Sequence, residues 1–355
     1  MDIYAVIMAG GVGSRFWPRS KKKTPKQLLK IIGEQTMIQE TVTRLNGIVK
    51  NENIYIITNK IQMAGVLTQL PELPVENIIE EPFGRNTAAC IGLASVLIRK
   101  KDPKAVTIIL PADHIIQGAE EFQKTLVQAA KFAEESDSIV TIGIPPSKPE
   151  TGYGYIQIDE NEVSDKIYKV LTFAEKPNYA TAVRFVESGD FFWNSGMFIQ
   201  RIDVILDEMK ELMPELYDGL MKIKDAIGKD NYPEILKTVY GHLRNISIDY
   251  GIMEKSQKVY LIKGTFMWSD VGSWEAVYEI GAKDNDGNIK VGHVYTEMSN
   301  NSYVYSPDKF AAIIGVDDLI VINDGDTLLI CRRDKSQDVK KIVDYLKINK
   351  INDYL

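Results

Sequence analysis

The sequence contains little cysteine and little histidine, and it has no long apolar run. Two cysteines among 355 residues, Cys90 and Cys331, cannot build a disulfide framework or a cysteine-based metal cluster. The three histidines, His114, His242 and His293, are isolated along the chain, so their spacing gives no zinc site. Any metal should therefore be a hard ion bound by oxygen atoms. No apolar run approaches the roughly 20 residues that a membrane span needs.

The chain also lacks an excess of basic residues and an export signal. Its net charge of -7 argues against general nucleic-acid binding, because a phosphate backbone is usually met by a basic surface. Residues 1–10 have no basic region ahead of their apolar stretch, so they do not form a signal peptide. We therefore expect a cytoplasmic protein with no nucleic-acid partner and no membrane partner.

Basic residues are nevertheless concentrated in one segment near the N-terminus. Seven lysines and arginines, and no acidic residue, lie between Arg15 and Lys30. A solvated basic loop would explain such a run. In an acidic chain, however, a single basic segment directly after the first apolar run favours a local and highly anionic ligand, such as a triphosphate.

Apolar β-rich runs alternate with helical patterns over the first 145 residues. Expected strands cover residues 3–8, 54–58, 78–79, 106–110 and 139–144, and expected helices cover 37–48, 61–70, 87–100 and a region around 122–133. Strands without polar residues, separated by helices, indicate a mostly parallel sheet that is covered on both faces. The sequence therefore predicts an α/β protein with a Rossmann-like domain.

The pattern changes twice along the rest of the chain. From about residue 151 the strands become shorter, and we interpret 151–258 as an insertion laid over the sheet. After a polar stretch, short β-type runs at 291–296, 303–305, 311–314, 319–322 and 328–331 are separated by Asn, Asp and Gly turns. A final amphipathic helix, with Asp334 as its N-cap, follows these runs. We predict a large domain at 1–282, which includes the insertion, and a small β-rich domain at 283–355.

A glycine-rich loop follows the first expected strand. Gly10, Gly11 and Gly13 would let the backbone approach phosphate oxygens and direct N–H groups at them. The loop is not the dinucleotide fingerprint, because Phe16 stands where the third glycine should be, and no Gly-Lys-Ser/Thr closes it as in a P-loop. A tight turn without a ligand would explain the glycines alone. Basic residues near the loop, above all Lys26, favour phosphate binding.

The loop residues resemble the signature of the sugar-1-phosphate nucleotidyltransferases. Phe-Trp-Pro-Arg-Ser at 16–20 and Pro-Lys-Gln at 25–27 are most similar to the members that transfer a guanylyl group to mannose 1-phosphate. The resemblance covers nearly the whole chain. It implies a nucleotidyltransferase domain in which nucleotide is held by the loop residues Ala9, Gly10, Gly11, Gly13, Ser14 and Gln27, and in which Arg15 and Lys26 grip the phosphates.

A second segment, at 80–87, is similar to the base-recognition element of this family. Guanine presents two parallel donors that one carboxylate can accept, whereas adenine would be poorly paired. Adjacent strand residues face opposite ways, so only one of Glu80 and Glu81 can read the base, and we favour Glu81. The resemblance implies that Arg85, Asn86 and Thr87 also line the nucleotide site. Asn86 or Thr87 is in addition a plausible N-cap for the helix that follows.

Two aspartates far apart in sequence are the expected metal ligands. Asp113 follows the expected strand at 106–110, and Asp270 lies in Trp-Ser-Asp-Val-Gly-Ser-Trp at 268–274. Each could instead cap a helix. If both lie at the carboxyl edge of the sheet, they could hold one Mg²⁺ that bridges phosphates, as the resemblance implies.

The expected sugar-phosphate site comes from three further segments, which begin at residues 151, 173 and 193. Each segment alone would pass for a turn. By resemblance to the family, the residues that bind the sugar phosphate are Gly152, Tyr153, Glu175, Lys176 and Asn194. The aromatic ring of Tyr153 could also serve only in packing.

Together these features predict a Mg²⁺-dependent enzyme that transfers GMP from GTP to mannose 1-phosphate and releases pyrophosphate. No general base is needed, because a phosphate monoester has its second pKa at about 6 and is largely dianionic at pH 7. A relative that uses another base or hexose, and a non-catalytic sensor of sugar nucleotides, are the alternatives. Some longer relatives carry an isomerase domain, which we do not expect here. A homodimer through the β-rich end is a further expectation.

Overall fold

The first strand shows how apolar runs build the core of this protein. In the computed structural model, which describes residues 2–355, β1 (Ile3–Met8) lies inside the sheet and is almost completely buried. Ile3, Ala5 and Ile7 pack into the core on one face of the sheet. Tyr4 and Val6 pack into the core on the other face. A strand covered on both faces needs apolar residues at every position, which explains the continuous run in the sequence.

The central sheet has nine strands and is mixed. Its order is β3 (Ile78–Glu81), β2 (Ile54–Asn59), β1, β4 (Val106–Pro111), β9 (Phe191–Arg201), β6 (Ile139–Ile144), β10 (Val259–Lys263), β8 (Ile167–Ala174) and β7 (Tyr155–Ser164). The strands from β3 to β4 are parallel, whereas β9 runs antiparallel to both of its neighbours. The predicted α/β class is confirmed, and the predicted parallel arrangement holds for the half of the sheet that contains β1.

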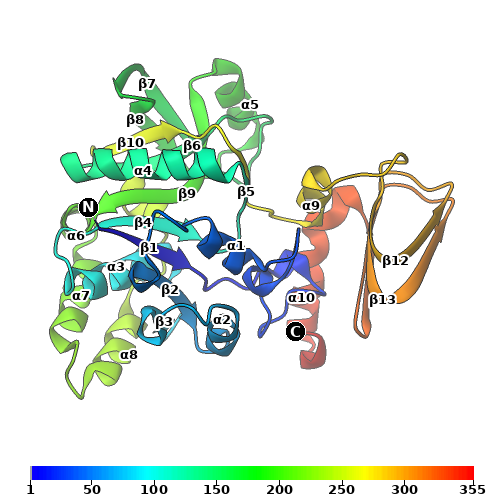
Figure 1. Cartoon of the computed structure of the whole chain (residues 1–355), viewed down its shortest axis with the longest axis horizontal. Helices are drawn as coiled ribbons and strands as arrows, with labels where there is room; N and C mark the ends of the chain where they lie inside the picture. The colour runs from blue at the N-terminus through cyan, green and yellow to red at the C-terminus, as the bar shows by residue number, and fades with distance from the viewer. Residues whose placement is uncertain (1) are drawn as a thin grey trace.

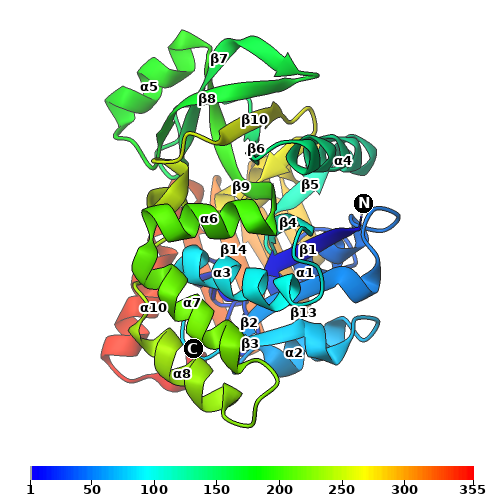
Figure 2. The same ribbon diagram turned by 90° about the vertical axis from the view of Figure 1, so that its left-hand side faces the viewer.

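Helices cover both faces of this sheet (Figures 1 and 2). One face carries α1 (Met37–Thr43), α2 (Met63–Gln69), α4 (Ala119–Glu135) and α5 (Tyr179–Ser188). The other face carries α3 (Asn86–Arg99), α6 (Ile202–Leu212), α7 (Pro214–Ala226), α8 (Tyr232–His242) and a π-helix, η5 (Asp249–Met253). Neither α5 nor α7 was predicted from the sequence. Among residues 2–355, no helix has the length and apolar character that a membrane crossing requires.

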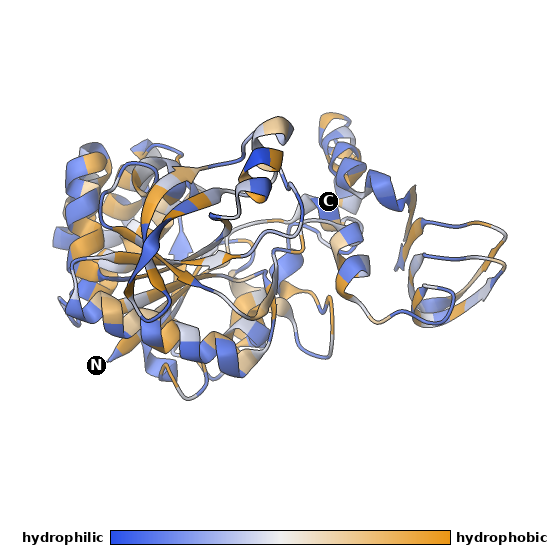
Figure 3. Cartoon of the chain, turned by 90° about the horizontal axis from the view of Figure 1, so that it is seen from above, coloured by the Kyte–Doolittle hydropathy of each residue, from blue (hydrophilic) through white to orange (hydrophobic). Residues whose placement is uncertain are grey.

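A separate β-rich module lies at one end of the molecule, on the right in Figures 1 and 3. It contains β12 (Ile289–Glu297), β13 (Tyr303–Ile314), β14 (Leu319–Asp324) and β15 (Thr327–Arg332), followed by a 3-10 helix (Arg333–Asp338) and α10 (Val339–Ile348). The two short strands predicted at 303–305 and 311–314 are one strand, β13. The predicted cap was wrong: Asp334 lies inside the 3-10 helix, where its carboxylate binds the Arg332 guanidinium at 3.1 Å.

The β-rich module, which we call the C-terminal module, packs directly against the basic N-terminal loop. The rings of Phe16 and Trp274 are 4.8 Å apart, and Trp274 belongs to α9 (Trp274–Ile280). Trp274 donates from its indole nitrogen to the carbonyl of Trp17, and Trp17 donates from its own to the carbonyl of Tyr354. Both aromatic loop residues are buried in the core of the module. This packing fixes the loop between the sheet and the module.

Candidate functional site

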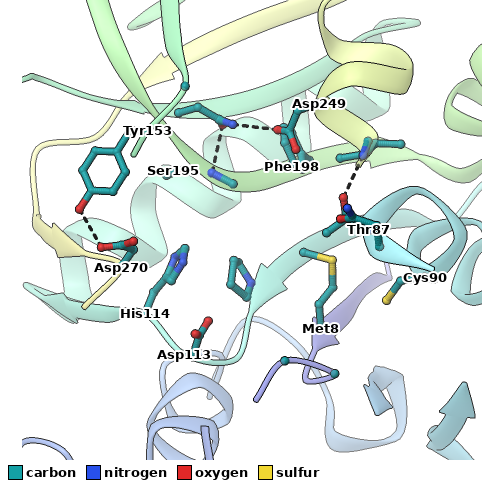
Figure 4. Close-up of a pocket in the computed structure, with 18 of the residues that line it drawn as sticks. Met8, Thr87, Cys90, Asp113, His114, Tyr153, Ser195, Phe198, Asp249 and Asp270 are labelled. Atoms are coloured by element: carbon teal, nitrogen blue, oxygen red, sulfur yellow. Dashed lines mark hydrogen bonds between the residues drawn. The ribbon is translucent and has the colours of Figure 1, made fainter. Parts of the chain in front are cut away.

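A cavity of about 480 Å³ opens where the parallel strands end (Figure 4). Met8 closes β1, Glu81 closes β3 and Pro111 closes β4, and all three line the cavity. The carboxyl ends of strands are the usual place for ligands in open α/β sheets. The opposite wall comes from β9 and from the turn that contains Asp249. The cavity thus lies between the parallel half of the sheet and the insertion.

The glycine loop forms one side of this cavity. Gly10 and Gly11 line it, and no backbone carbonyl among residues 2–355 accepts from their N–H groups. Gln27 donates from its amide to the carbonyls of Ala9 (2.8 Å) and Gly11 (3.0 Å), so it supports the curve of the loop from behind. Ala9 itself is buried. The loop therefore presents unpaired backbone donors to the cavity, as an anion site requires.

Gly13 allows a lysine to come close to the loop. Its φ of 70° lies in the left-handed region, and a Cβ at this position would be 2.5 Å from Cβ of Lys26. Lys26 can therefore pass against the loop backbone. Its side chain is only 5% exposed, and its ammonium group binds the Asp113 carboxylate at 3.0 Å and the Asp270 carbonyl at 2.5 Å. Lys26 thus joins the loop to both acidic segments.

A small ribbon brings the two aspartates together. β5 (Ile115–Gln117) pairs antiparallel with β11 (Met267–Ser269), and Ser269 lies opposite Ile115. Asp113 and Asp270 extend from adjoining ends of this ribbon, and both line the cavity. Neither caps a helix, because a strand follows Asp113 and Ser273 stands at the N-cap of α9.

The surroundings of Asp113 favour the ionised form of its carboxyl group. Burial would raise its pKa, but the charges of Lys26 and His114, and the hydrogen bond from Lys26, outweigh burial and lower the pKa of Asp113. Burial lowers the pKa of His114, whose Nδ1 lies 3.2 Å from the indole nitrogen of Trp268. The Asp113 side chain remains 38% exposed, so it can reach a ligand in the cavity.

Tyr153 holds the second aspartate. Its hydroxyl donates to Oδ1 of Asp270 at 2.7 Å (Figure 4), and burial together with the Asp270 charge raises the pKa of Tyr153. The hydroxyl therefore stays protonated and remains a donor. Its ring packs edge-on against Trp193 and Trp268.

Asp113 and Asp270 could hold a magnesium ion that also binds substrate. Within the described part of the chain, no group of three or more His, Cys, Asp or Glu side chains could hold a metal ion. Mg²⁺ is usually held by one or two carboxylates together with water and phosphate oxygens, rather than by an all-protein cage. Asp113 and Asp270 match this donor set.

Glu81 lies at the end of the cavity next to the glycine loop. It is buried and lines the cavity, whereas the neighbouring Glu80 is exposed. Tyr240, from α8, donates a short hydrogen bond to Oε1 of Glu81. Burial raises the pKa of Glu81 to about 7, although this hydrogen bond opposes the shift. The cavity therefore holds a carboxyl group, that of Glu81, whose ionisation is opposed by burial.

The residues that follow Glu81 have different positions. Asn86 and Thr87 line the cavity, whereas Arg85 does not and instead donates a short hydrogen bond to the Gly241 carbonyl. Thr87 accepts from the Ile248 amide at 2.8 Å. The predicted N-cap at Asn86 or Thr87 was wrong, since Arg85 precedes the first turn of α3 and Asn86 is the first residue of the helix.

Four of the five predicted sugar-binding residues, Gly152, Tyr153, Glu175 and Asn194, line the cavity. The side chain of Glu175 is 7% exposed, and its Oε1 binds the Lys176 ammonium. Its Oε2 is buried without a hydrogen-bond partner in the described structure, and Glu175 is one of the residues that line the cavity. A buried acceptor without a partner is rare in proteins and costly. Gly152 and Tyr153 lie beside it on the same wall.

Asn194 is held in one orientation by its neighbours, one of which, Asp249, is labelled in Figure 4. Its amide nitrogen donates to Asp249 at 2.9 Å, and its amide oxygen accepts from the Gly196 N–H at 3.0 Å. Burial, followed by the charge of Glu175, raises the pKa of Asp249 to about 6. The amide is therefore pre-oriented toward the cavity.

Sequence reasoning missed two residues of this site, Tyr240 and Asp249. Both lie in apolar helical patterns and are far in sequence from their partners, Glu81 and Asn194. An acid among apolar residues at 246–253 was the one available signal for Asp249.

Arg15 and Lys176 are not brought into the main cavity. They line an adjoining space of about 930 Å³ between the sheet and the C-terminal module. Gly152, Tyr153 and Asp270 line both spaces, so the two adjoin each other. Arg15 is exposed, and Ser14 beside it is half-buried and lines neither space.

Comparisons with known proteins agree with this arrangement. A family model described as Nucleotidyl transferase matches residues 4–287, and a model described as MannoseP isomerase/GMP-like beta-helix domain matches residues 293–346. Mannose-1-phosphate guanylyltransferase RfbM of Salmonella typhimurium is 40% identical over 359 residues, which cover 100% of this chain and 74% of that protein. A mannose-1-phosphate guanylyltransferase of Escherichia coli K12 is 39% identical over 353 residues, which cover 97% and 73%.

A solved structure matches the whole chain. The crystal structure of mannose-1-phosphate geranyltransferase from Thermus thermophilus superposes with a TM-score of 0.89 at 31% identity. The match covers 98% of this chain and 100% of that chain. The likeness therefore extends over the sheet, the insertion and the C-terminal module together.

Proposed function

The chain belongs to the nucleotidyl transferase family, among its mannose-1-phosphate guanylyltransferases, and from this premise we propose that it transfers GMP from GTP to mannose 1-phosphate. One arrangement carries the proposal. Two largely buried carboxyl groups, those of Glu81 and Glu175, line one cavity together with Asp113 and Asp270, and the Lys26 ammonium binds both aspartate residues. Glu81 would accept from the guanine donors, and Glu175 would accept from a sugar hydroxyl.

The reaction is an in-line displacement at the α-phosphorus of GTP. A phosphate oxygen of mannose 1-phosphate forms the new P–O bond, and the bond from the α-phosphorus to the oxygen shared with the β-phosphorus breaks. Pyrophosphate leaves with that electron pair. No proton has to be removed from the attacking oxygen, because the monoester is already ionised at pH 7. The protein therefore acts by alignment and by stabilising negative charge.

Each group of residues has one part in this alignment. The N–H groups of Gly10 and Gly11, from which no backbone carbonyl of residues 2–355 accepts, would bind the phosphates, and Lys26 would add a positive charge that its contacts hold in place. Arg15, which lines the adjoining space, would bind the departing pyrophosphate. Asp113 and Asp270 would hold Mg²⁺, which when bound neutralises charge on the phosphate oxygens.

The direct test mixes the protein with GTP, Mg²⁺ and mannose 1-phosphate and measures pyrophosphate release. The test then extends to a matrix of nucleotides and sugar 1-phosphates. We expect the highest kcat/KM with GTP and mannose 1-phosphate. Faster turnover of UTP or dTTP with glucose 1-phosphate would refute the guanylyl assignment. If no substrate pair released pyrophosphate, the proposal that this chain is an active nucleotidyltransferase would be refuted.

We also propose that the small domain begins at residue 283 and that it forms a homodimer. Large apolar side chains are exposed on this module, including Phe310, Leu328 and Ile330. An exposed apolar patch on a folded module often marks an interface. Light scattering should give twice the mass of one chain, and Ile330→Glu should reduce it to one. A wild-type protein with the mass of one chain would exclude the dimer.

A further inference from the structure

A second pocket, of about 330 Å³, lies on the helical face of the sheet, away from the catalytic cavity. It is formed where α6 meets α7, by the end of α8 and by the loop after it; these three helices lie on the side of the sheet that faces the viewer in Figure 2. Its volume falls within the range of about 300–1,000 Å³ that is usual for small-molecule sites. The residues that line it include Met213, His242, Arg244, Gly251 and Lys255.

One chain segment, residues 240–251, separates this second pocket from the catalytic cavity. His242 and Ile246 line the second pocket, whereas Ile248 and Asp249 line the catalytic cavity. We call residues 240–251 the connecting segment. It is thin enough that residues two positions apart face different ligand spaces.

The connecting segment is bonded to the base-side residues of the catalytic cavity. The Tyr240 hydroxyl donates to Glu81, and the carbonyl of Gly241 accepts from Arg85. Further along, the Ile246 carbonyl accepts from the first turn of α3 at 3.3 Å, through the amide of Ala88.

The same segment continues to the sugar side. The Ile248 amide donates to Thr87 at 2.8 Å, and Asp249 accepts from Asn194 at 2.9 Å. The base-side and sugar-side residues of the cavity are therefore positioned by the wall of the second pocket.

The π-helix η5 provides a direct link between the two spaces. Asp249, its first residue, lies in the catalytic cavity, and Gly251 lies in the second pocket. Met213 packs so closely on Gly251 that a Cβ there would be 2.5 Å from the Met213 sulfur. A π-helix is rare and often occurs at functional sites. A ligand seated against Met213 therefore bears on the turn that holds Asp249.

The chemistry of the second pocket selects its ligand. The inner wall is apolar and includes Leu216 and Leu243, which are buried. The rim carries Arg244 and Lys255, against one acid, Glu215. Arg244 binds Glu215 at 2.9 Å, but both side chains are more than 70% exposed, and such ion pairs contribute little and are easily exchanged. The pocket thus offers an apolar surface with cations at its edge.

We propose that the second pocket binds a small anion with an apolar body, and that its occupancy changes the affinity of the catalytic cavity for nucleotide through the connecting segment. Binding itself does not depend on the proposed guanylyl activity, whereas the effect on GTP rests on it. Energetic coupling of this kind is reciprocal, so GTP must also change the affinity of the second pocket for its ligand.

The test uses the full chain with methionines carrying ¹³C-labelled methyl groups and the probe 1-anilinonaphthalene-8-sulfonate, an aromatic anion. Three methyl groups report on three places: Met213 lines the second pocket, Met8 lines the catalytic cavity, and Met298 is exposed on the C-terminal module. Single Met→Leu variants assign the three resonances. We expect a saturable shift of the Met213 resonance as the probe is added.

A charge-reversed variant tests the ligand chemistry. Arg244→Glu combined with Lys255→Glu should raise the dissociation constant of the probe at Met213 by about tenfold or more, because charge-assisted contacts are the strong ones. Lys131→Glu combined with Arg184→Glu is the matched control, since both residues are exposed and lie outside the second pocket. With the Met213 site saturated, the Kd for GTP should change by about fivefold or more, as is typical of allosteric coupling.

Each contrary result overturns a named part of the proposal. A Met213 resonance that does not shift, or shifts only in proportion with that of Met298, removes the binding site. Equal affinity of the charge-reversed and control variants for the probe would show that the second pocket does not select an anion. An unchanged Kd for GTP at saturation removes the coupling. A protein that binds the probe at Met213 but releases no pyrophosphate from any substrate pair refutes the proposed function and leaves the site standing.

Discussion

Replacing Glu81 by glutamine should make the protein more stable and a poorer binder of GTP. Burial raises the pKa of this carboxyl from 4.5 to about 7. A shift of that size corresponds to about 3 kcal/mol between the two protonation states. In the empty cavity, the ionised form of Glu81 is therefore a source of instability that a neutral glutamine of the same shape removes.

The direction of the pH dependence follows from this shift. The unfolded chain loses the Glu81 proton near pH 4.5, whereas the folded chain keeps it until about pH 7. Between these values the folded state binds more protons, so the contribution of Glu81 to stability falls as the pH rises and is constant above about pH 7. Glu81→Gln should therefore unfold like the wild type at pH 4.5, and should gain up to about 3 kcal/mol at pH 8.

GTP binding should depend on pH in the opposite direction to stability. The two donors of guanine favour the ionised carboxylate, so GTP affinity of the wild type should rise with pH up to about 7, relative to Glu81→Gln. The quantity to compare is the ratio of the GTP affinities of the wild type and Glu81→Gln, because ionisation of the GTP phosphates affects both proteins equally. Loss of a charge-assisted pair should weaken GTP binding about 10–100-fold at pH 8.

Two measurements check this reasoning. Thermal unfolding at pH 4.5 and pH 8 gives the stability difference, and calorimetric titration with GTP gives the affinity ratio across the same range. Tyr240→Phe, which removes the hydrogen bond that lowers the pKa of Glu81, should shift the affinity profile to higher pH. A ratio that does not vary with pH, or a variant that is no more stable at pH 8, would refute the role of Glu81.

Three further predictions concern the phosphate and sugar sides. Arg15→Ala should lower kcat about 10²–10³-fold in pyrophosphate-release assays, as expected for loss of one transition-state donor, and an unchanged kcat would remove Arg15 from the mechanism. Gly13→Ala should cost about 1–3 kcal/mol in thermal unfolding, because its φ is +70° and Cβ of Lys26 is in the way, whereas Gly11→Ala has open space and serves as the control; equal losses would contradict the strain argument. Glu175→Gln should raise KM for mannose 1-phosphate about tenfold and leave KM for GTP unchanged, and an effect on both would place Glu175 elsewhere.

The sequence predicted those parts of the fold that depend on local pattern. β1 could be recognised because burial on both faces demands an unbroken apolar run, and it appears within the predicted bounds. The period of two along a strand also separated Glu80 from Glu81, and the structure places one in solvent and the other in the cavity. α5 was not recognised, because it is only 10 residues long and Ala182 alone is fully buried along its length.

How the residues of the site come together in space could be predicted only in part. Asp113 and Asp270 were expected at the same edge of the sheet, but the three-residue ribbon of β5 and β11 that joins their segments is too short to leave a pattern in the sequence. The position of Arg15 could not be derived either. It depends on the packing of Phe16 and Trp17 into the C-terminal module, which turns the adjacent side chain toward the adjoining space.

Catalytic chemistry and substrate selection are supported by different parts of this chain. Lys26, Asp113 and Asp270 are held by the glycine loop and the short ribbon, which adjoin the C-terminal module. Glu81 and Asn194 are held by the connecting segment on the helical face. Because the connecting segment bonds to Glu81 and Asn194 and makes none of the cited bonds to Lys26, Asp113 or Asp270, a change in this segment should alter KM and the choice between substrates more than the rate of the bond-breaking step. The fold can therefore adjust which nucleotide and sugar it accepts without rebuilding the site that joins them.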